Sequence, residues 1–320
     1  MDIQSQKTAA ATLSVVSNSV LVVLKIIVGL LIGSVSVISE AIHSGVDLIA
    51  AIIALVAVKT SGQPADKEHP FGHGKVENVS GTIEALLIFL AAAWIIYEAI
   101  NKLLHPHPLK AAGWGIAVML FSAIANIIVS SKLFKVGKEA DSVALQADAW
   151  HLRTDVYTSA GVMAGLCLIW IAHKIVPDIN LDWIDPVTAI VVALLIIMAA
   201  YRLTVESGRD LLDISLPAEE ETWIRNHVSN RTPIVKGFHN LRTRKAGSDR
   251  FVEFHLMVSS DMSVEESHRI SDEITGDIKN RLSRVTVTIH IEPCNGDCTP
   301  SCLSGCLLPE PDRILIQAKL

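Results

Sequence analysis

The chain has 320 residues, of which half are hydrophobic, and its formal net charge is −6 at pH 7. A mean hydropathy of +0.43 is high for a soluble protein of this length, and long apolar runs are typical of membrane proteins. A mildly acidic chain without a large basic patch excludes nucleic acid as an expected partner. The first apolar run is too long for a signal peptide and lacks a small-residue cleavage site, so none is expected.

Six segments are long and apolar enough to cross a bilayer, each near the roughly 20 residues that a transmembrane helix needs. We place them at residues 11–32, 35–58, 79–104, 113–134, 143–173 and 186–205. Lys and Arg are more frequent in the loops after the second and fourth segments than in the opposite loops. Because these residues concentrate on the cytoplasmic side of membrane proteins, both termini are predicted to be cytoplasmic.

The pattern His-x-x-x-Asp occurs twice inside these segments, as His43 with Asp47 and as His151 with Asp155. Residues four apart share one face of a helix, so each pair presents a nitrogen and an oxygen to one point. An ionisable side chain deep in a bilayer costs roughly 2.5–3.5 kcal/mol. Two such helices together supply two nitrogens and two oxygens, enough for a tetrahedral divalent metal such as zinc. The alternative is a structural role, in which the four side chains form hydrogen bonds between helices.

The loop after the second segment contains three further potential ligands, Asp66, His69 and His73, at spacings of three and four residues. Three protein ligands leave one position of a metal open. This set predicts a second metal site, which either binds the ion on its way to the membrane or braces the loop. The alternative is a solvated polar loop with incidental histidines.

From about Gly208 the composition changes to that of a soluble domain. Periodicity predicts the order α-β-β-α-β, over residues 217–231, 235–247, 250–260, 263–283 and 285–293. The core of so small a domain is limited, and pairing with a second copy would stabilise it. We therefore expect three parts: a transmembrane domain at residues 1–207, a cytoplasmic α+β (αββαβ) domain at residues 208–293, and a tail at residues 294–320.

Histidines are scattered over several elements of the predicted soluble domain. They are His239 and His255 on the first two strands, His268 on the second helix, and His290 with Glu292 on one face of the last strand. Taken singly, each of these residues is interpreted as an ordinary surface histidine. Side chains on four neighbouring elements of a small fold can also converge on a metal, so the sequence leaves both interpretations open.

The tail contains four cysteines, each separated from the next by three residues: Cys294, Cys298, Cys302 and Cys306. This spacing differs from the paired C-x-x-C of zinc ribbons, and a disulfide framework is not expected in a reducing cytosol. Four thiolates can bind one soft cation, as a sensor or a capture site. The alternative is an unstructured tail with free thiols.

Five segments carry a wider pattern, namely SEAIHSGVD, PADKEHPFGHGKVE, DAWHLRTDVYTS, GFHNLRTRKAG and VEFHLMV. Together they resemble the cation diffusion facilitators, a family of zinc/proton antiporters, over nearly the whole chain. The resemblance implies a transport site of His43, Asp47, His151 and Asp155, and a loop site of Asp66, His69 and His73. It also implies a binuclear cytoplasmic site at a dimer interface, formed by His239, His255, His268 and His290, with Glu292 where relatives often have Asp. Lys75 and Asp213 match a salt bridge near the membrane surface.

The same resemblance implies Zn²⁺/H⁺ antiport by a homodimer, a multi-pass protein of the bacterial inner membrane that is a secondary active transporter and not an enzyme. Zinc is then both substrate and a structural or regulatory ion, and protons are the counter-ion. His43, where some relatives carry Asp, favours borderline-soft metals over hard ones. A carrier of Cd²⁺, Co²⁺, Fe²⁺ or Mn²⁺ is the alternative within the family. Two other classes stay open: a membrane-embedded zinc metalloenzyme, although no HExxH motif is present, and a membrane-anchored metal sensor.

Overall fold

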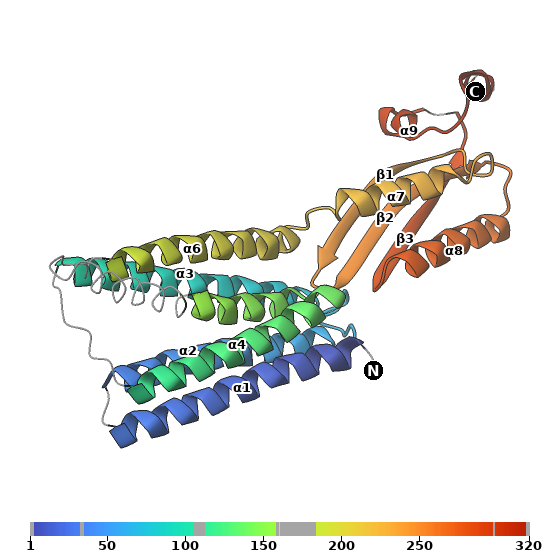
Figure 1. Cartoon of the computed structure of the whole chain (residues 1–320). Coiled ribbons are helices and arrows are strands. Elements are labelled where there is room, and N and C mark those ends of the chain that lie inside the picture. The colour runs from blue at the N-terminus through green and yellow to red at the C-terminus, as the bar shows by residue number, and fades with distance from the viewer. Residues whose placement is uncertain are drawn as a thin grey trace. The chain divides into compact units, whose positions relative to one another are not determined.

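The computed structural model describes residues 3–32, 35–104, 113–157, 160, 184–296 and 298–317. The chain divides into two compact units, Met1–Arg209 and Asp210–Leu320. Figure 1 shows long helices in the first unit and a small sheet with shorter helices in the second. The predicted combination of a helical membrane domain with a small α+β domain is confirmed.

The helices of the first unit are α1 (Ile3–Ile32), α2 (Val35–Ser61), α3 (Lys75–Leu104), α4 (Gly113–Glu139) and α6 (Ile184–Leu211). A further helix occupies residues 143–157. Within the described residues, 5 helices contain a stretch long and apolar enough to cross a membrane, and these are α1, α2, α3, α4 and α6. Of the predicted fifth segment, residues 158–159 and 161–173 lie outside the described residues.

Helix α3 begins at Lys75, four residues before the predicted apolar segment, because its polar first turn is buried in the protein. Glu77 in that turn is 0% exposed. It accepts hydrogen bonds from Lys7 of α1, from Ser61 of α2 at 2.6 Å, and from Ser142 just before the helix at residues 143–157. Hydropathy alone reads such residues as a loop, so it places the helix start too late.

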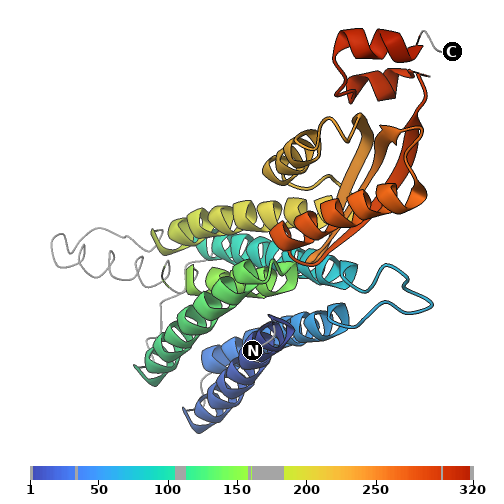
Figure 2. The same cartoon turned by 90° about the vertical axis from the view of Figure 1, so that its right-hand side faces the viewer.

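Small side chains line the contacts between the membrane helices. Ala10 of α1, Ala57 of α2 and Ala144 belong to one buried cluster. Ala147 belongs to a second buried cluster, formed with α3 and α6, which Figure 2 shows side by side. The helix at residues 143–157 therefore packs against both groups of helices, and alanine allows the backbones to approach closely.

The second unit contains α7 (Ala218–Ser229), β1 (Gly237–Ala246), β2 (Asp249–Ser259), α8 (Val264–Arg281), β3 (Val285–Cys294), α9 (Pro300–Ser304) and α10 (Glu310–Gln317). The strand order is β1-β2-β3. The first pair is antiparallel and the second is parallel, with α8 connecting the parallel strands. The predicted αββαβ order is confirmed, and the short helices α9 and α10 in the tail were not predicted.

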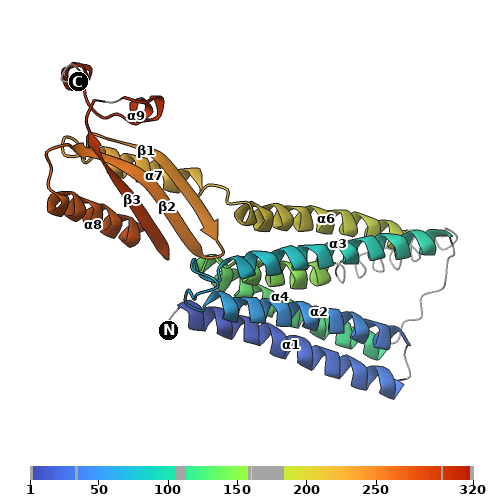
Figure 3. The same ribbon diagram turned by 180° about the vertical axis from the view of Figure 1, so that it is seen from behind.

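Helices α7 and α8 cover one face of the sheet. Phe254 and Leu256 of β2 belong to the same buried core as Ile224 of α7 and Ile274 of α8. Because successive strand residues point to opposite faces, His255 lies on the other face. Figure 3 shows the molecule from behind, with the strands in front of α7.

Candidate metal centres

The transmembrane pairs come from α2 and from the helix at residues 143–157. The Nε2 atom of His151 lies 3.1 Å from Oδ1 of Asp47, and Nε2 of His43 lies 3.8 Å from Oδ1 of Asp155. Each histidine therefore contacts the aspartate of the other helix. The ligand atoms of His43, Asp47 and Asp155 lie within 4.8 Å of one another. The arrangement brings two imidazoles and two carboxylates into one region between two helices.

The two crosswise pairs differ in their access to the surroundings. Asp47 and His151 are each 4% exposed, whereas the side chain of His43 is 49% exposed. A charge that is withdrawn from water interacts more strongly with its partner than an exposed one does. The transmembrane cluster therefore has a deeply buried half, Asp47 with His151, and a more exposed half, His43 with Asp155.

Besides Lys7 and Glu77, three further buried charged side chains of this unit were missed in the sequence. Asp148, one turn before His151, and Glu84 of α3 are both 0% exposed. Lys25 of α1 is 4% exposed and donates a hydrogen bond to Ser44 at 2.7 Å. Asp148, His151 and Asp155 form the pattern Asp-x-x-His-x-x-x-Asp, in which all three residues lie on one face of the helix. This spacing could have revealed Asp148 in the sequence. Lys25 and Glu84 are charged residues inside predicted transmembrane segments, a costly position that could have revealed both.

The loop between α2 and α3 brings Asp66, His69 and His73 together, with ligand atoms within 4.8 Å of one another. The Asp66 carboxylate lies 3.3 Å from Nδ1 of His69 and 3.4 Å from Nε2 of His73. It also accepts hydrogen bonds from the backbone N–H groups of His69 at 2.6 Å and of Glu68 at 2.9 Å. These bonds, the one from His69 foremost, hold the pKa of Asp66 below its ordinary value. The carboxylate is therefore ionised at neutral pH, as a metal ligand must be.

The cluster on the sheet uses side chains from all three strands. Strand register places His239, His255 and His290 in one row. Glu292, on the same face as His290, lies 3.0 Å from Nε2 of His239, 2.8 Å from Nδ1 of His255 and 3.5 Å from Nε2 of His290. Burial opposes ionisation of Glu292, but hydrogen bonds from His239 and His255 bring its pKa below the ordinary value. The ligand atoms of His239, His255 and Glu292 lie within 4.8 Å of one another.

His268 is not part of this cluster within the described chain. It lies on α8, where its side chain is 73% exposed and its Nε2 atom is 3.4 Å from Oδ2 of Asp272. A contribution to a site shared by two copies of the chain stays a prediction. The salt bridge between Lys75 and Asp213 also stays a prediction, because the two residues belong to different units. Within its own unit, Asp213 lies 3.4 Å from Arg244.

The four tail cysteines are free thiols. They line a single small cavity beside β1 and β2. The structure thus places them together, although they are spread over 13 residues of sequence.

Two family models match the chain, a cation efflux transmembrane domain over residues 11–212 and a cation efflux protein cytoplasmic domain over residues 216–294. The chain belongs to the cation efflux family. The resemblance to cation diffusion facilitators is thereby confirmed. Members of the cation efflux family are multi-pass membrane transporters, so the chain is a transporter and not an enzyme, and the metalloenzyme alternative is wrong. The cytoplasmic domain type indicates dimerisation.

Several relatives in the cation efflux family match most of the chain. An uncharacterized transporter of Synechocystis, sll1263, is 37% identical over 261 residues, which is 82% of either chain. The cation-efflux pump FieF of Citrobacter koseri is 32% identical over 287 residues, which cover 89% of this chain and 92% of the pump. Among solved structures, the zinc form of CzrB, a proposed zinc transporter, is 38% identical. That match covers 27% of this chain and 96% of the CzrB chain, with a TM-score of 0.24.

Proposed function

We propose that this cation efflux protein exports divalent metal ions in exchange for protons, with Zn²⁺ as its preferred substrate. The observation that carries the proposal is the crosswise pairing of His151 with Asp47 at 3.1 Å and of His43 with Asp155 at 3.8 Å. Two imidazoles and two carboxylates suit a tetrahedral borderline-soft cation such as zinc. Manganese and magnesium prefer sites made of oxygen ligands alone.

Proton coupling follows from the chemistry of the same four side chains. Histidine binds metal in its neutral form and aspartate in its ionised form, so metal and protons compete for the same atoms. Metal that enters from the neutral cytoplasm displaces protons, and protons from the opposite side displace the metal. The competition links the outward movement of the cation to the inward movement of protons.

The division of the ligands between two helices supports alternating access. Helix α2 carries one imidazole and one carboxylate, and the helix at residues 143–157 carries the others. Any movement of one helix against the other changes the distance between the two ligands on α2 and the two ligands on the helix at residues 143–157. Rocking of helices around a central site is a common way for transporters to expose it to each side in turn.

We assign supporting roles to the other clusters. The loop site of Asp66, His69 and His73 either binds the ion on its way to the membrane or braces the loop. The sheet site of His239, His255 and Glu292, with His290 and His268, binds a structural or regulatory Zn²⁺ in a homodimer. In this proposal both termini are in the cytoplasm, the membrane is the bacterial inner membrane, and the domains are residues 1–207 and 208–293 with a tail at residues 294–320.

Zinc uptake into proteoliposomes that enclose a zinc-sensitive dye tests the transport site. We expect Asp47→Ala and Asp155→Ala to lose most of the uptake that a pH gradient drives. Gly45→Ala is the matched control on α2, because a Cβ added at Gly45 has nothing within 4 Å. Unchanged uptake by both aspartate variants would refute the transport site.

Two further measurements test the substrate and the counter-ion. A pH-sensitive dye in the same vesicles should report protons moving against the zinc, and zinc movement without proton movement would refute antiport. Calorimetric titration with Zn²⁺, Cd²⁺, Co²⁺, Mn²⁺ and Fe²⁺ should rank Zn²⁺ first. Tighter binding of Mn²⁺ or Fe²⁺ would contradict the preference for zinc.

A further inference from the structure

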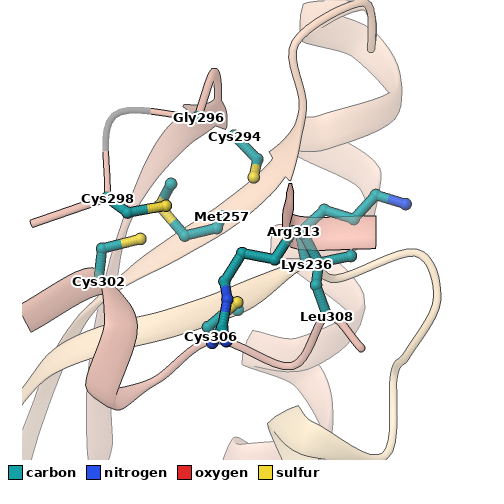
Figure 4. A pocket seen from close by; sticks show the side chains of 10 residues that line it. Lys236, Met257, Cys294, Gly296, Cys298, Cys302, Cys306, Leu308 and Arg313 are labelled. Carbon is teal, nitrogen blue, oxygen red and sulfur yellow. The ribbon is translucent and has the colours of Figure 1, made fainter. Parts of the chain in front are cut away.

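The four tail cysteines surround one small cavity at the edge of the sheet. Cys294 is the last residue of β3, and Cys298 lies in the connection from β3 to α9. Cys302 lies in α9, and Cys306 follows it. Figure 4 shows the sulfur atoms of Cys294, Cys298 and Cys302 directed toward the space around Met257. The cavity has a volume of about 10 Å³, which is about that of one water-sized sphere. Its size therefore suits a single ion rather than an organic ligand.

The tail reaches this position by pairing with the free edge of the sheet. Strand β1 is an edge strand because the order is β1-β2-β3. The backbone N–H of Phe238 donates to the carbonyl of Gly305 at 3.0 Å, and that of Leu307 donates to the carbonyl of Lys236 at 3.0 Å. Cys306 forms an antiparallel bridge with Gly237. The tail thus extends the sheet and covers the exposed edge of β1, as proteins do to protect such edges.

Glycine at position 305 is required for this contact. A Cβ added there would lie 1.7 Å from the carbonyl oxygen of Phe238, and one added at Gly237 would lie 2.9 Å from the carbonyl oxygen of Gly305. Two backbones can approach so closely only where no side chain intervenes. The position of the cysteines is therefore set by a specific backbone contact.

The other residues around the cavity suit a cation held by thiolates. Met257 of β2 contributes a polarisable thioether, which is soft in the same sense as a thiolate. Lys236 and Arg313 also line the cavity. Four thiolates around a divalent cation leave an excess of negative charge, which these two positive side chains offset.

We propose that the four tail cysteines bind one cation of the zinc and cadmium class as thiolates, and that the bound ion holds the tail against the edge of β1. Tetrahedral sites of four sulfur ligands select such cations. Within the described residues, no three of these sulfur atoms belong to a group whose ligand atoms all lie within 4.8 Å of one another. In this proposal, binding of the cation therefore draws the sulfur atoms closer together. The site is separate from the proposed transport site and does not depend on transport.

Titration of the purified, reduced full-length protein with Cd²⁺ tests the site. Cadmium bound to thiolates has an ultraviolet charge-transfer band that histidine and carboxylate ligands do not produce, so the other clusters do not contribute. We expect the band to saturate with the amplitude of one thiolate-bound cadmium per chain. Replacing Cys294, Cys298, Cys302 and Cys306 together by Ser should abolish the band. Cys167→Ser, at the fifth cysteine of the chain, is the control and should keep it.

A second pair of variants tests whether docking of the tail assembles the site. Gly305→Ala keeps every thiol but blocks the contact with β1, so we expect its apparent affinity for Cd²⁺ to fall at least about tenfold. Gly276→Ala on α8 is the matched control, because a Cβ there has nothing within 4 Å. The absence of a band in the unmodified protein, or its persistence in the fourfold variant, would overturn the proposal. Wild-type affinity in Gly305→Ala would overturn the part played by the sheet edge.

Discussion

The transmembrane cluster and the sheet cluster use the same side chains, imidazoles and carboxylates, on different backbones. In the membrane unit the ligands lie on two helices, and side-chain contacts such as that of His151 with Asp47 connect them. In the sheet, backbone hydrogen bonds fix His239, His255 and His290 in one row. Helices can shift against each other without breaking backbone hydrogen bonds, whereas paired strands cannot. The first arrangement therefore suits an ion that must be released, and the second suits an ion that stays.

The largest expected effect is at Asp47. Asp47→Asn keeps the shape of the side chain but removes the charge that binds the cation. Loss of a residue that only hydrogen-bonds to a metal ligand typically costs about 10–100-fold in metal affinity. Asp47 is itself a proposed ligand, so we expect zinc uptake to fall by roughly 100-fold or more. Glu292→Gln makes the same chemical change in the sheet, and we expect its uptake rate to stay within about tenfold of the wild type. Equal losses in the two variants would contradict the division between a transport site and a resident site.

The next effect is on stability and concerns the network around Glu77. Glu77→Gln removes the negative charge that faces the buried Lys7 amine. We expect a loss of about 1–3 kcal/mol in the free energy of unfolding, measured as a lower melting temperature in detergent. Amide hydrogen exchange in β1, β2 and β3 should not change, because the network lies within the first unit. Faster exchange in the strands would show that the two units are not independent.

A third effect separates metal binding from transport. His255→Ala removes a ligand from the middle strand, and we expect zinc affinity at the sheet to fall by about 10–100-fold. His227→Ala is the matched control, since His227 of α7 pairs with Asp277 of α8 at 3.0 Å, outside the sheet cluster. Equilibrium dialysis of the full-length protein measures the difference. Equal zinc binding by both variants would exclude His255 as a ligand.

Periodicity predicted the elements and the faces that they present, but not the partners across the fold. The spacing of His43 and Asp47 indicates one helix face. It does not show that His43 contacts Asp155, because that contact depends on how two helices pack. In the sheet, alternation places His290 and Glu292 on one face, whereas only the strand register shows that Glu292 reaches three histidines.

The features that the sequence did not reveal depend on long-range contacts. Lys7 and Glu77 flank apolar segments, where charged residues are usually exposed, yet each is nearly fully buried against the other. The docking of the tail depends on Gly305, whose need for a glycine comes from Phe238, 67 residues earlier in the chain. Local sequence patterns do not show which distant residues will become neighbours. The cysteine spacing alone therefore could not distinguish a metal site from an unstructured tail with free thiols.

The smallest expected effect is the pH dependence of the sheet cluster in metal-free protein. The pKa of Glu292 is lower in the folded protein than its ordinary value, which is about 4.3 in an unfolded chain. Its carboxylate therefore stabilises the sheet above that pH, and the contribution is lost as the pH falls through the folded pKa. We expect Glu292→Gln to reduce the protection of β3 against hydrogen exchange by less than about 1 kcal/mol at neutral pH. The difference should shrink below about pH 4, while Glu265→Gln, on the exposed surface of α8, serves as the control. A difference that grows in acid would mean that the carboxylate destabilises the row of histidines instead of holding it together.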